Sequence, residues 1–361
     1  MKITDLHLEN FRNYKAEDFT FEGGLNVICG ENGAGKTNVL ESVYLMSLFN
    51  SPRTTKDKDL IFFGEEKARI KLQVEKRFRK HTLILQIEGN GKKKVVVDGI
   101  PVKRAAELIG VLGVVFFSPD EMRLVKESPA ERRRFLDVGI SQQQRAYFAA
   151  LSRYNKILKQ KNNLLKDAYR LGNIDDMLSV WDAQLAEYGA VIIDRRRKYI
   201  EKLNAAAAEF HTVISGEKEK LAISYECPVD GENTEEIRPR LLEKIEQSRE
   251  KDISLGFGTV GPHRDDLAIE VNGLDSRKFA SQGQQRTIAL ALKLGEAEMY
   301  RKESAETPVL LLDDVLSELD PERQTKLIEL TRGMQTLLTC TEFREEGPAN
   351  IIRISAGRAV R

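Results

Sequence analysis

Cysteine and histidine are scarce in this sequence, and their scarcity excludes several classes of protein. Among 361 residues there are three cysteines, Cys29, Cys227 and Cys340, so a disulfide framework and a CxxC motif are both missing. The four histidines stand apart and give no obvious set of zinc ligands. An odd, scattered set of cysteines fits a reducing compartment, and we expect a cytoplasmic protein.

Long hydrophobic runs are also missing. The longest nearly unbroken apolar run covers residues 108–117 and is far shorter than the roughly 20 residues of a membrane span. Residues 1–3 lead into an alternating pattern that differs from a signal peptide. We therefore expect no contact with a membrane.

Neither sign of charge dominates. Lys and Arg number 57 and Asp and Glu number 56, and the net charge of +1 excludes both a wholly basic coat for nucleic acid and a highly charged disordered chain. Hydrophobic residues make up 41% of the chain, which is enough for a sizeable core. Because domains average about 150 residues, the length predicts two or three of them.

Strand patterns occupy the two ends of the chain and helix patterns its middle. Alternating apolar residues over 70–98 predict an antiparallel meander, and a buried strand is expected over Val114–Phe117. A helix start is predicted at residues 118–121, where a proline and a Ser-x-x-Glu capping box coincide. From there to about residue 248 the pattern is mainly helical, and strand character returns over residues 267–271.

Two long helices dominate the predicted helical middle. Apolar residues keep a heptad-like spacing over 145–167 and over 181–199, with a break at Gly172-Asn173 between them. Antiparallel helices of this kind would bury one apolar stripe against each other. We therefore predict an α/β fold with a discontinuous head and an inserted helical lobe that contains a short antiparallel helical hairpin. The head would comprise residues 1–125 and 250–361, and the lobe residues 126–249.

One motif matches the phosphate-binding pattern GxxxxGK[ST] at every position. Its residues are Gly30, Glu31, Asn32, Gly33, Ala34, Gly35, Lys36 and Thr37. An apolar strand precedes the motif and a helical pattern follows it, so its backbone N–H groups would surround a phosphate at a helix N-terminus. Lys36 is expected to reach the β- and γ-phosphates, and the Thr37 hydroxyl to ligate Mg²⁺. The motif predicts binding of ATP with Mg²⁺.

Two acids end an apolar run near the C-terminus. Residues 308–312 are followed by Asp313 and Asp314, and an acid at the end of a buried strand is placed to hold Mg²⁺. We predict that Asp313 is the metal ligand and that Asp314 orients or deprotonates the attacking water. The other interpretation is a strand that ends in a solvated acidic turn.

A third motif begins a long helical stretch. It consists of Ser281, Gln282, Gly283, Gln284, Gln285 and Arg286. Ser281 and Gln284 have the spacing of a helix capping box, which is the simpler interpretation. The alternative is an anion site at the helix N-terminus, formed by Ser281 and the Gly283 backbone.

Together the three motifs resemble the ABC-type ATPases, in which a signature helix precedes the strand with the paired acids. Ser317 and Asp320 lie shortly after those acids and resemble the D-loop of the family. In such ATPases the signature of one subunit covers the nucleotide held by another. The resemblance therefore implies an ATP-dependent homodimer with two ATP molecules between the protomers and with Ser281 acting in trans.

Further segments in order along the chain are similar to the RecF family, which is related to structural-maintenance-of-chromosomes ATPases. They are Leu8-Glu9-Asn10-Phe11-Arg12-Asn13-Tyr14, Ser51-Pro52-Arg53-Thr54, Glu131-Arg132-Arg133-Arg134-Phe135-Leu136-Asp137, Gly261-Pro262-His263-Arg264-Asp265-Asp266-Leu267 and residues 281–286. The resemblance spans nearly the whole chain. It implies an ABC-type ATPase head, binding of double-stranded and gapped DNA, RecR and RecO as partners, and help in loading RecA during recombinational repair and the SOS response.

Other ABC-type classes match less well. A transporter ATPase subunit usually has a Gln where residues 118–121 stand, a His where residues 337–341 stand, and a Glu at the position of Asp314. These departures imply weak, slow hydrolysis, which we expect DNA to stimulate. A chromosome-organising ATPase would need a longer helical insertion, and a nucleotide-gated scaffold without hydrolysis is a further alternative.

Basic residues are concentrated in one segment. Residues 131–170 carry a net charge of +7, whereas the rest of the chain is mildly acidic. Such a cluster could neutralise several DNA phosphates, or could be a set of solvated helix faces. The DNA-binding candidates are Arg132, Arg133, Arg134, Arg145, Arg153 and Lys156. For His263 and Arg264, which lie beside two acids, an ion-paired loop is favoured over a catalytic role.

Overall fold

The computed structural model describes residues 1–103, 105–171, 174–343 and 348–360. The chain forms two compact units. The first unit contains Met1–Met122, Phe210–Glu217 and Leu290–Arg361, and the second contains Arg123–Glu209 and Lys218–Ala289. Residues 250–289, which we assigned to the head, group with the second unit, and the predicted boundaries of head and lobe stay a prediction. The expected break at Gly172-Asn173 lies outside the described residues.

A six-stranded antiparallel sheet forms one layer of the first unit, with the order β2-β1-β4-β5-β6-β7. Its strands are β1 (Lys2–Phe11), β2 (Tyr14–Thr20), β4 (Lys67–Glu75), β5 (Lys80–Glu88), β6 (Lys93–Val97) and β7 (Ile100–Pro101). Buried and exposed residues alternate along β4 and β5, as expected of a sheet with one covered face. The predicted meander over 70–98 is confirmed by the pairing of β4 with β5 and of β5 with β6.

The second sheet of this unit has the order β15-β14-β3-β13-β12-β8, and its strands run parallel except for β15. They are β3 (Leu25–Cys29), β8 (Val114–Phe117), β12 (Val309–Asp313), β13 (Thr336–Cys340), β14 (Asn350–Ser355) and β15 (Arg358–Val360). Every residue of β8, β12 and β13 is buried, because parallel strands are covered on both faces. The predicted strand Val114–Phe117 is confirmed.

Helix α1 (Lys36–Leu48) joins the two sheets of the first unit. Val39 and Leu40 belong to one buried cluster that also contains residues of the antiparallel sheet, such as Leu6, and of the parallel sheet, such as Leu311. The other elements of this unit are short helical turns at Asp57–Leu60, Ala105–Glu107, Pro119–Met122 and Leu316–Glu318, and helix α11 (Pro321–Leu330). Helix α10 (Gln282–Ser304) begins in the second unit and belongs to the first from Leu290 onward. At the helix start expected at residues 118–121, a 3₁₀ turn over Pro119–Met122 leads directly into the short helix α2 (Arg123–Lys126).

Helices make up most of the second unit. They are α2 (Arg123–Lys126), α3 (Pro129–Gln143), α4 (Arg145–Lys166), α5 (Ala168–Leu171), α6 (Asp175–Ser215), α7 (Thr234–Gln247), α8 (Arg249–Leu255) and α9 (Ser276–Phe279). A small antiparallel sheet accompanies them, with the order β11-β10-β9. Its strands are β9 (Leu221–Glu226), β10 (Asp266–Val271) and β11 (Leu274–Asp275). Strand β9 interrupts the region that the sequence pattern predicted to be helical.

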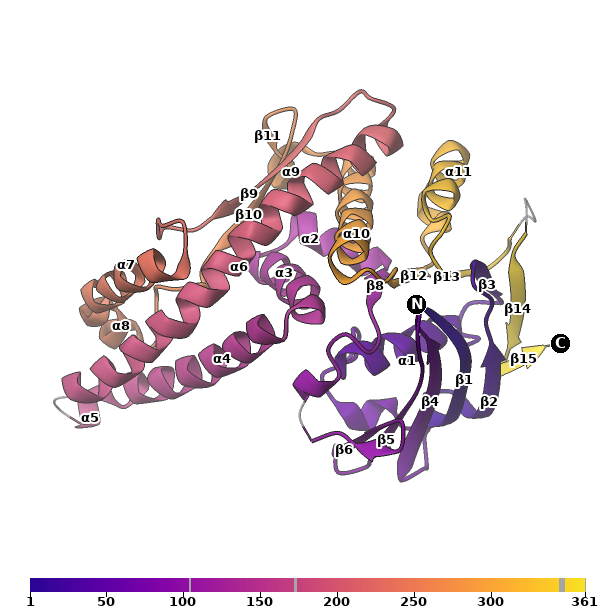
Figure 1. The fold of residues 1–361 in the computed structure, drawn as a ribbon, viewed down its shortest axis with the longest axis horizontal. Helices are drawn as coiled ribbons and strands as arrows, with labels where there is room; N and C mark the ends of the chain where they lie inside the picture. The colour runs from indigo at the N-terminus through magenta and orange to yellow at the C-terminus, as the bar shows by residue number, and fades with distance from the viewer. Residues whose placement is uncertain (104, 172–173, 344–347, 361) are drawn as a thin grey trace. The chain divides into compact units, whose positions relative to one another are not determined.

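Helices α4 and α6 form the predicted antiparallel hairpin, and they run side by side in Figure 1. Arg153 Nη1 donates to the Tyr188 hydroxyl at 3.0 Å, and the Lys161 ammonium lies 2.8 Å from the Asp182 carboxylate. As residue numbers rise along α4, those of their partners in α6 fall, so the two chains run in opposite directions. Among the described residues, no helix combines the length and the hydropathy that a bilayer crossing demands.

Candidate functional site

The loop between β3 and α1 has a backbone that depends on its glycines. Gly33 and Gly35 have φ angles of 83° and 113°, a region that residues with a side chain rarely adopt. A Cβ atom at Gly35 would lie 2.5 Å from the Asn13 amide nitrogen, and one at Gly30 would lie 2.2 Å from the Ile354 carbonyl oxygen. The loop is therefore a close-fitting backbone cradle, as the phosphate-binding motif predicts.

Lys36 lies inside this cradle. Its ammonium donates to the Gly30 carbonyl at 2.6 Å and to the Glu31 carbonyl at 3.0 Å. Asn13 steadies the loop from outside, because its side-chain amide donates to the Ala34 carbonyl at 3.0 Å. The loop thus surrounds a buried cation at the start of a helix, which is an environment that attracts a phosphate group.

The two predicted metal ligands meet at the end of the parallel sheet. Thr37 Oγ1 donates to Asp313 Oδ1 at 2.9 Å, and Thr339 Oγ1 donates to the same oxygen at 2.7 Å. Burial raises the pKa of the Asp313 carboxyl, and the hydrogen bonds from Thr339 and Thr37 oppose that rise. A hydroxyl and a carboxylate side by side are the oxygen ligands that Mg²⁺ prefers, so the residues fit this ion.

Asp314 follows with an uncommon backbone. Its φ angle is 50°, in the left-handed region, and its N–H donates to Thr339 Oγ1 at 2.9 Å. Thr339 therefore holds both acids, one through the side chain and the other through the backbone. Sequence reasoning missed this role of Thr339, although the missing histidine of residues 337–341 had drawn attention to the segment.

A buried ion-pair network adjoins the cradle and was also missed. The Glu41 carboxylate, whose side chain is 0% exposed, accepts two hydrogen bonds from the Arg12 guanidinium at 2.6 and 2.8 Å and one from the Ser51 hydroxyl at 2.5 Å. Arg53 donates to Asn38 Oδ1 at 2.8 Å and to Glu41 at 3.5 Å. Both arginines lie in segments that resemble the RecF family, which was the available signal.

A broad cleft opens beside this network. Its volume is about 700 Å³, and its lining includes Arg12, Asn13, Arg53, Lys58 and the fully exposed Phe63. Asn13 lines the cleft and also bonds the loop around Lys36, so the cleft lies next to the phosphate cradle. Three cationic residues and an exposed aromatic ring suit an anionic ligand that carries a flat apolar group.

The capping box predicted at the start of α10 is present. Ser281 Oγ accepts from the Gln284 N–H at 3.3 Å, and Gln284 Oε1 accepts from the Ser281 N–H at 2.8 Å. Gln284 also donates to Glu219 at 2.8 Å, which fixes its side chain. Ser281 and Gln282 are exposed. The motif therefore places a serine hydroxyl and a helix N-terminus on the surface of the second unit.

The predicted D-loop residues have local partners. Ser317 Oγ donates to the Asp314 carbonyl at 2.8 Å, so this serine supports the backbone of the second acid. Asp320 caps helix α11 by accepting from the Arg323 N–H at 3.0 Å. Both side chains also remain exposed.

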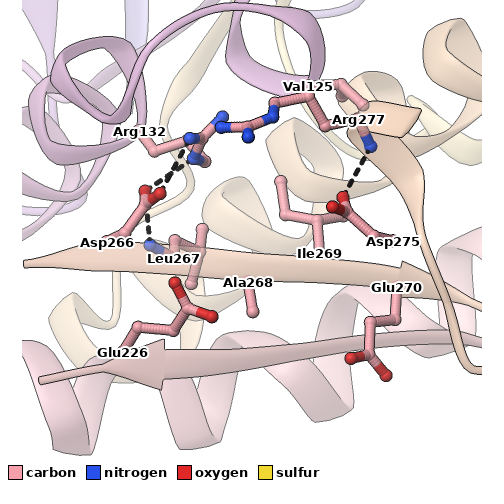
Figure 2. A pocket seen from close by; sticks show the side chains of 10 residues that line it. All are labelled: Val125, Arg132, Glu226, Asp266, Leu267, Ala268, Ile269, Glu270, Asp275 and Arg277. Atoms are coloured by element: carbon pink, nitrogen blue, oxygen red, sulfur yellow. Dashed lines mark hydrogen bonds and ion pairs between the residues drawn. The ribbon is translucent and has the colours of Figure 1, made fainter.

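Arg132 corrects one of the DNA-binding predictions. Its guanidinium makes two hydrogen bonds, at 2.7 and 2.8 Å, to the Asp266 carboxylate, and its side chain is 4% exposed. Figure 2 shows this pair at one end of a pocket of about 240 Å³ beside β10. Arg133 likewise donates inward, to the Asp265 carbonyl at 2.8 Å, and burial lowers the pKa of its guanidinium. Arg132 is therefore a structural residue of the second unit.

The other cationic candidates remain on the surface. Arg134 is exposed on α3, and Arg145, Arg153 and Lys156 are exposed on α4. Helix α4 contains six cationic residues and no acid. At about 100° per residue, five of the six lie within an arc of roughly 140°. The sixth, Lys161, is buried on the other side, where Asp182 and Asp252 neutralise it.

His263 lies in the loop before β10, and its printed contacts are hydrogen bonds to neutral groups, so the ion pairing that we favoured for His263 and Arg264 stays a prediction. Its Nδ1 lies 2.7 Å from the Tyr154 hydroxyl oxygen, and its Nε2 lies 3.0 Å from the Gly258 carbonyl oxygen, both within hydrogen-bond distance. Burial lowers the pKa of the His263 imidazole to about 4. The Arg264 guanidinium lies 4.8 Å from the centre of the Phe257 ring, stacked on its face. These contacts hold the loop that leads into β10.

Relatives of known identity match this chain along nearly its whole length. The family model described as the RecF/RecN/SMC N terminal domain matches residues 2–346. The DNA replication and repair protein RecF of Agathobacter rectalis is 44% identical over 345 residues, which cover 96% of this chain and 93% of the relative. RecF of Clostridium acetobutylicum is 42% identical over 363 residues, which cover 99% of both chains.

Solved structures agree with these relatives. The recombination mediator protein RecF in the RecFOR pathway, with ATPrS, has a TM-score of 0.93 and 38% identity, and the match covers 99% of this chain and 97% of that one. An Smc head bound to a domain of ScpA has a TM-score of 0.58 at 16% identity and shares the fold alone. Fold and site define a P-loop ATPase of the ABC type with an SMC-like head. The chain belongs to the RecF family of DNA replication and repair proteins.

Proposed function

We propose that this protein binds ATP with Mg²⁺ in the cradle around Lys36 and uses the bound nucleotide to form a homodimer on DNA. The observation that carries this proposal is the junction of Thr37, Asp313 and Thr339 beside a loop of positive-φ glycines. The two structures of RecF with ATP and ATPrS, which are 37% and 38% identical to this chain, support the choice of nucleotide.

The residues of the site would divide the work between binding and hydrolysis. Backbone N–H groups of residues 33–37 and the Lys36 ammonium would hold the phosphates in place of the carbonyl partners that Lys36 has now. Mg²⁺ bound by Thr37 and Asp313 would offset phosphate charge. Asp314, with its backbone fixed by Thr339, would orient the attacking water and accept its proton.

In the proposed dimer, contacts between the two protomers would complete both ATP-binding sites. Ser281 and the first turn of the 23-residue helix α10 are on the surface, where the positive end of the helix can meet a phosphate. In the proposed dimer, Ser281 of one protomer covers the ATP held by the other, together with the D-loop residues Ser317 and Asp320. Hydrolysis would be weak and stimulated by DNA, and it would release the dimer.

Double-stranded DNA next to a single-stranded gap is the proposed ligand of the dimer. The cationic face of α4 extends over about 32 Å at 1.5 Å per residue, close to one turn of a DNA duplex. Contacts would go mainly to phosphates, because α4 presents no base-reading pattern. The RecFOR pathway named for the solved relative supports RecR, with RecO, as the partner. The proposal further holds that the protein acts in the cytoplasm and aids RecA indirectly.

Replacing Lys36 tests the nucleotide site. We expect Lys36→Met to lower ATP affinity at least 100-fold, because a buried methionine offers the γ-phosphate neither charge nor hydrogen bonds. Titration calorimetry with ATP and Mg²⁺ measures the change. The matched control is Lys302→Met on the exposed face of α10, which should bind ATP like the parent protein. Equal ATP affinity of Lys36→Met and the control would refute the proposal.

A further inference from the structure

Two cysteines stand side by side at the edge of the ATP site. Cys29 is the last residue of β3, directly before the phosphate loop, and Cys340 is the last residue of β13. The two strands are parallel neighbours, and the two cysteines are partners in their register. Their sulfur atoms are 3.5 Å apart. The proposed ATPase chemistry uses neither thiol.

The backbone beneath the pair is suited to a cross-link. Neighbouring strands lie about 4.8 Å apart, and disulfides span Cα separations of about 4.4 to 6.8 Å. Partner residues of paired strands project to the same face, and the short distance between the sulfur atoms agrees with this. A bond of about 2.05 Å needs the sulfur atoms to approach by roughly 1.5 Å.

We propose that Cys29 and Cys340 form a dithiol site that a peroxide oxidises to a disulfide, which closes the nucleotide site. The effect on ATP rests on the proposed function, whereas the cross-link itself does not. Cys29 is half-buried and reacts first, because Cys340 is 4% exposed and burial raises the pKa of its thiol to about 12.

One molecule of hydrogen peroxide is enough to oxidise the two thiols to a disulfide. The Cys29 sulfur attacks one peroxide oxygen, the O–O bond breaks, and a sulfenic acid forms with release of water. The Cys340 sulfur then attacks the Cys29 sulfur, the S–O bond breaks, and a second water leaves with the Cys340 proton. Two thiols lose two electrons in total, and the peroxide gains them. A thiol reductant reverses the change.

The disulfide would distort the site from two directions. On one side, the Gly30 backbone is packed against the Ile354 carbonyl, and the Gly30 carbonyl holds Lys36. On the other side, Thr339 precedes Cys340 and holds the Asp313 carboxylate. The strand spacing already suits the bond, so the sulfur atoms approach mainly by side-chain rotation, and the strain that remains falls on the two strand ends. Those ends carry the phosphate cradle and the Thr339 that holds Asp313, and a misplacement of about 1 Å can cost 100-fold in rate.

The test compares the reduced and the peroxide-treated full-length protein. Mass spectrometry of proteolytic peptides should find Cys29 joined to Cys340, and ATP affinity should fall at least tenfold and recover with dithiothreitol. Cys340→Ser should keep its ATP affinity after the same treatment. Cys227→Ser is the matched control, because Cys227 lies in the second unit, and it should respond like the parent protein.

Several outcomes would overturn the inference. Failure to find the joined peptide after treatment that oxidises Cys227 would exclude the dithiol site. A joined peptide with unchanged ATP affinity would exclude the control of the nucleotide site. If the reduced protein binds no ATP, the proposed function fails instead, and the joined peptide still decides whether the thiols react with each other.

Discussion

The Asp313 carboxylate gathers the contacts on which the proposed chemistry depends. Burial at the end of β12 disfavours the ionised carboxylate and raises its pKa. Hydrogen bonds donated by the Thr37 and Thr339 hydroxyls stabilise the ionised carboxylate and oppose that rise. Hydrogen bonds to a charged group contribute about 1.5 to 3 kcal/mol each. One oxygen thus ties the phosphate loop to two strands, and the site depends on an exact arrangement of three side chains.

His263 allows a test of pH dependence at a single residue. The Gly258 carbonyl can only accept, so Nε2 carries the proton and Nδ1 accepts from Tyr154. The pKa of the folded imidazole is about 4, below the usual value of about 6.5. Between these values the unfolded chain binds a proton that the folded chain does not. Stability therefore falls as pH drops from about 6.5 to about 4, by up to about 3 kcal/mol.

Urea unfolding of the parent protein and of His263→Gln over this pH range measures the effect. The glutamine does not titrate, so the two free energies of unfolding should converge as pH falls. Parallel curves for the parent protein and His263→Gln would contradict the assigned environment.

The sequence predicted those site residues that lie within one short motif. Residues 30–37 and the pair Asp313 and Asp314 were predicted in this way, because the order of residues along the chain already sets their local geometry; the structure places Thr37 beside Asp313, and their roles stay predictions. Thr339 and Glu41 were missed, since their partners come from other elements. Arg132 was misjudged for the same reason: its partner Asp266 lies 134 residues further along the chain. A single sequence gives no signal for side-chain pairs between residues that lie far apart along the chain.

Helix α4 combines a buried structural face with an exposed cationic face, which is the proposed DNA surface. Its buried face carries Tyr154, Ile157 and Lys161, and its exposed face carries five cationic residues. The heptad-like spacing predicted this helix and its antiparallel partner, because burial imposes a period on the sequence. Strand β9 was not predicted, since six residues give too little alternation to outweigh the helical patterns around it.

Reversing two charges on α4 tests the DNA surface. We expect Lys156→Glu combined with Lys159→Glu to weaken DNA binding at least tenfold and to reduce the salt slope of the affinity by about 2, because two phosphate contacts are lost. Fluorescence anisotropy with a gapped duplex over a series of salt concentrations measures both quantities.

The control for the α4 double variant changes the net charge by the same amount on a different helix, α7. Arg238 and Arg240 are exposed on α7, a helix that also carries several acids. Arg238→Glu combined with Arg240→Glu should change the affinity much less and leave the salt slope nearly unaltered. If the two double variants weaken binding equally, the effect is one of overall charge, and α4 is not the DNA surface.

The whole molecule divides its chemistry between two compact units. The phosphate cradle and both acids belong to the first unit, whereas Ser281 belongs to the second. The net charge of +1 hides this division, because a basic segment of the second unit balances an otherwise acidic chain. A protein of this kind would hold DNA over a limited surface and under the control of ATP.

The central claim is that Ser281 completes the ATP site of another protomer, and mixing two inactive variants tests it most directly. Lys36→Met keeps an intact signature, and Ser281→Arg keeps an intact phosphate loop. Light scattering with ATP and Mg²⁺ should find each variant monomeric alone. Their mixture should form heterodimers, because one composite site is intact. A mixture that stays monomeric, under conditions in which the parent protein dimerises, would contradict the account.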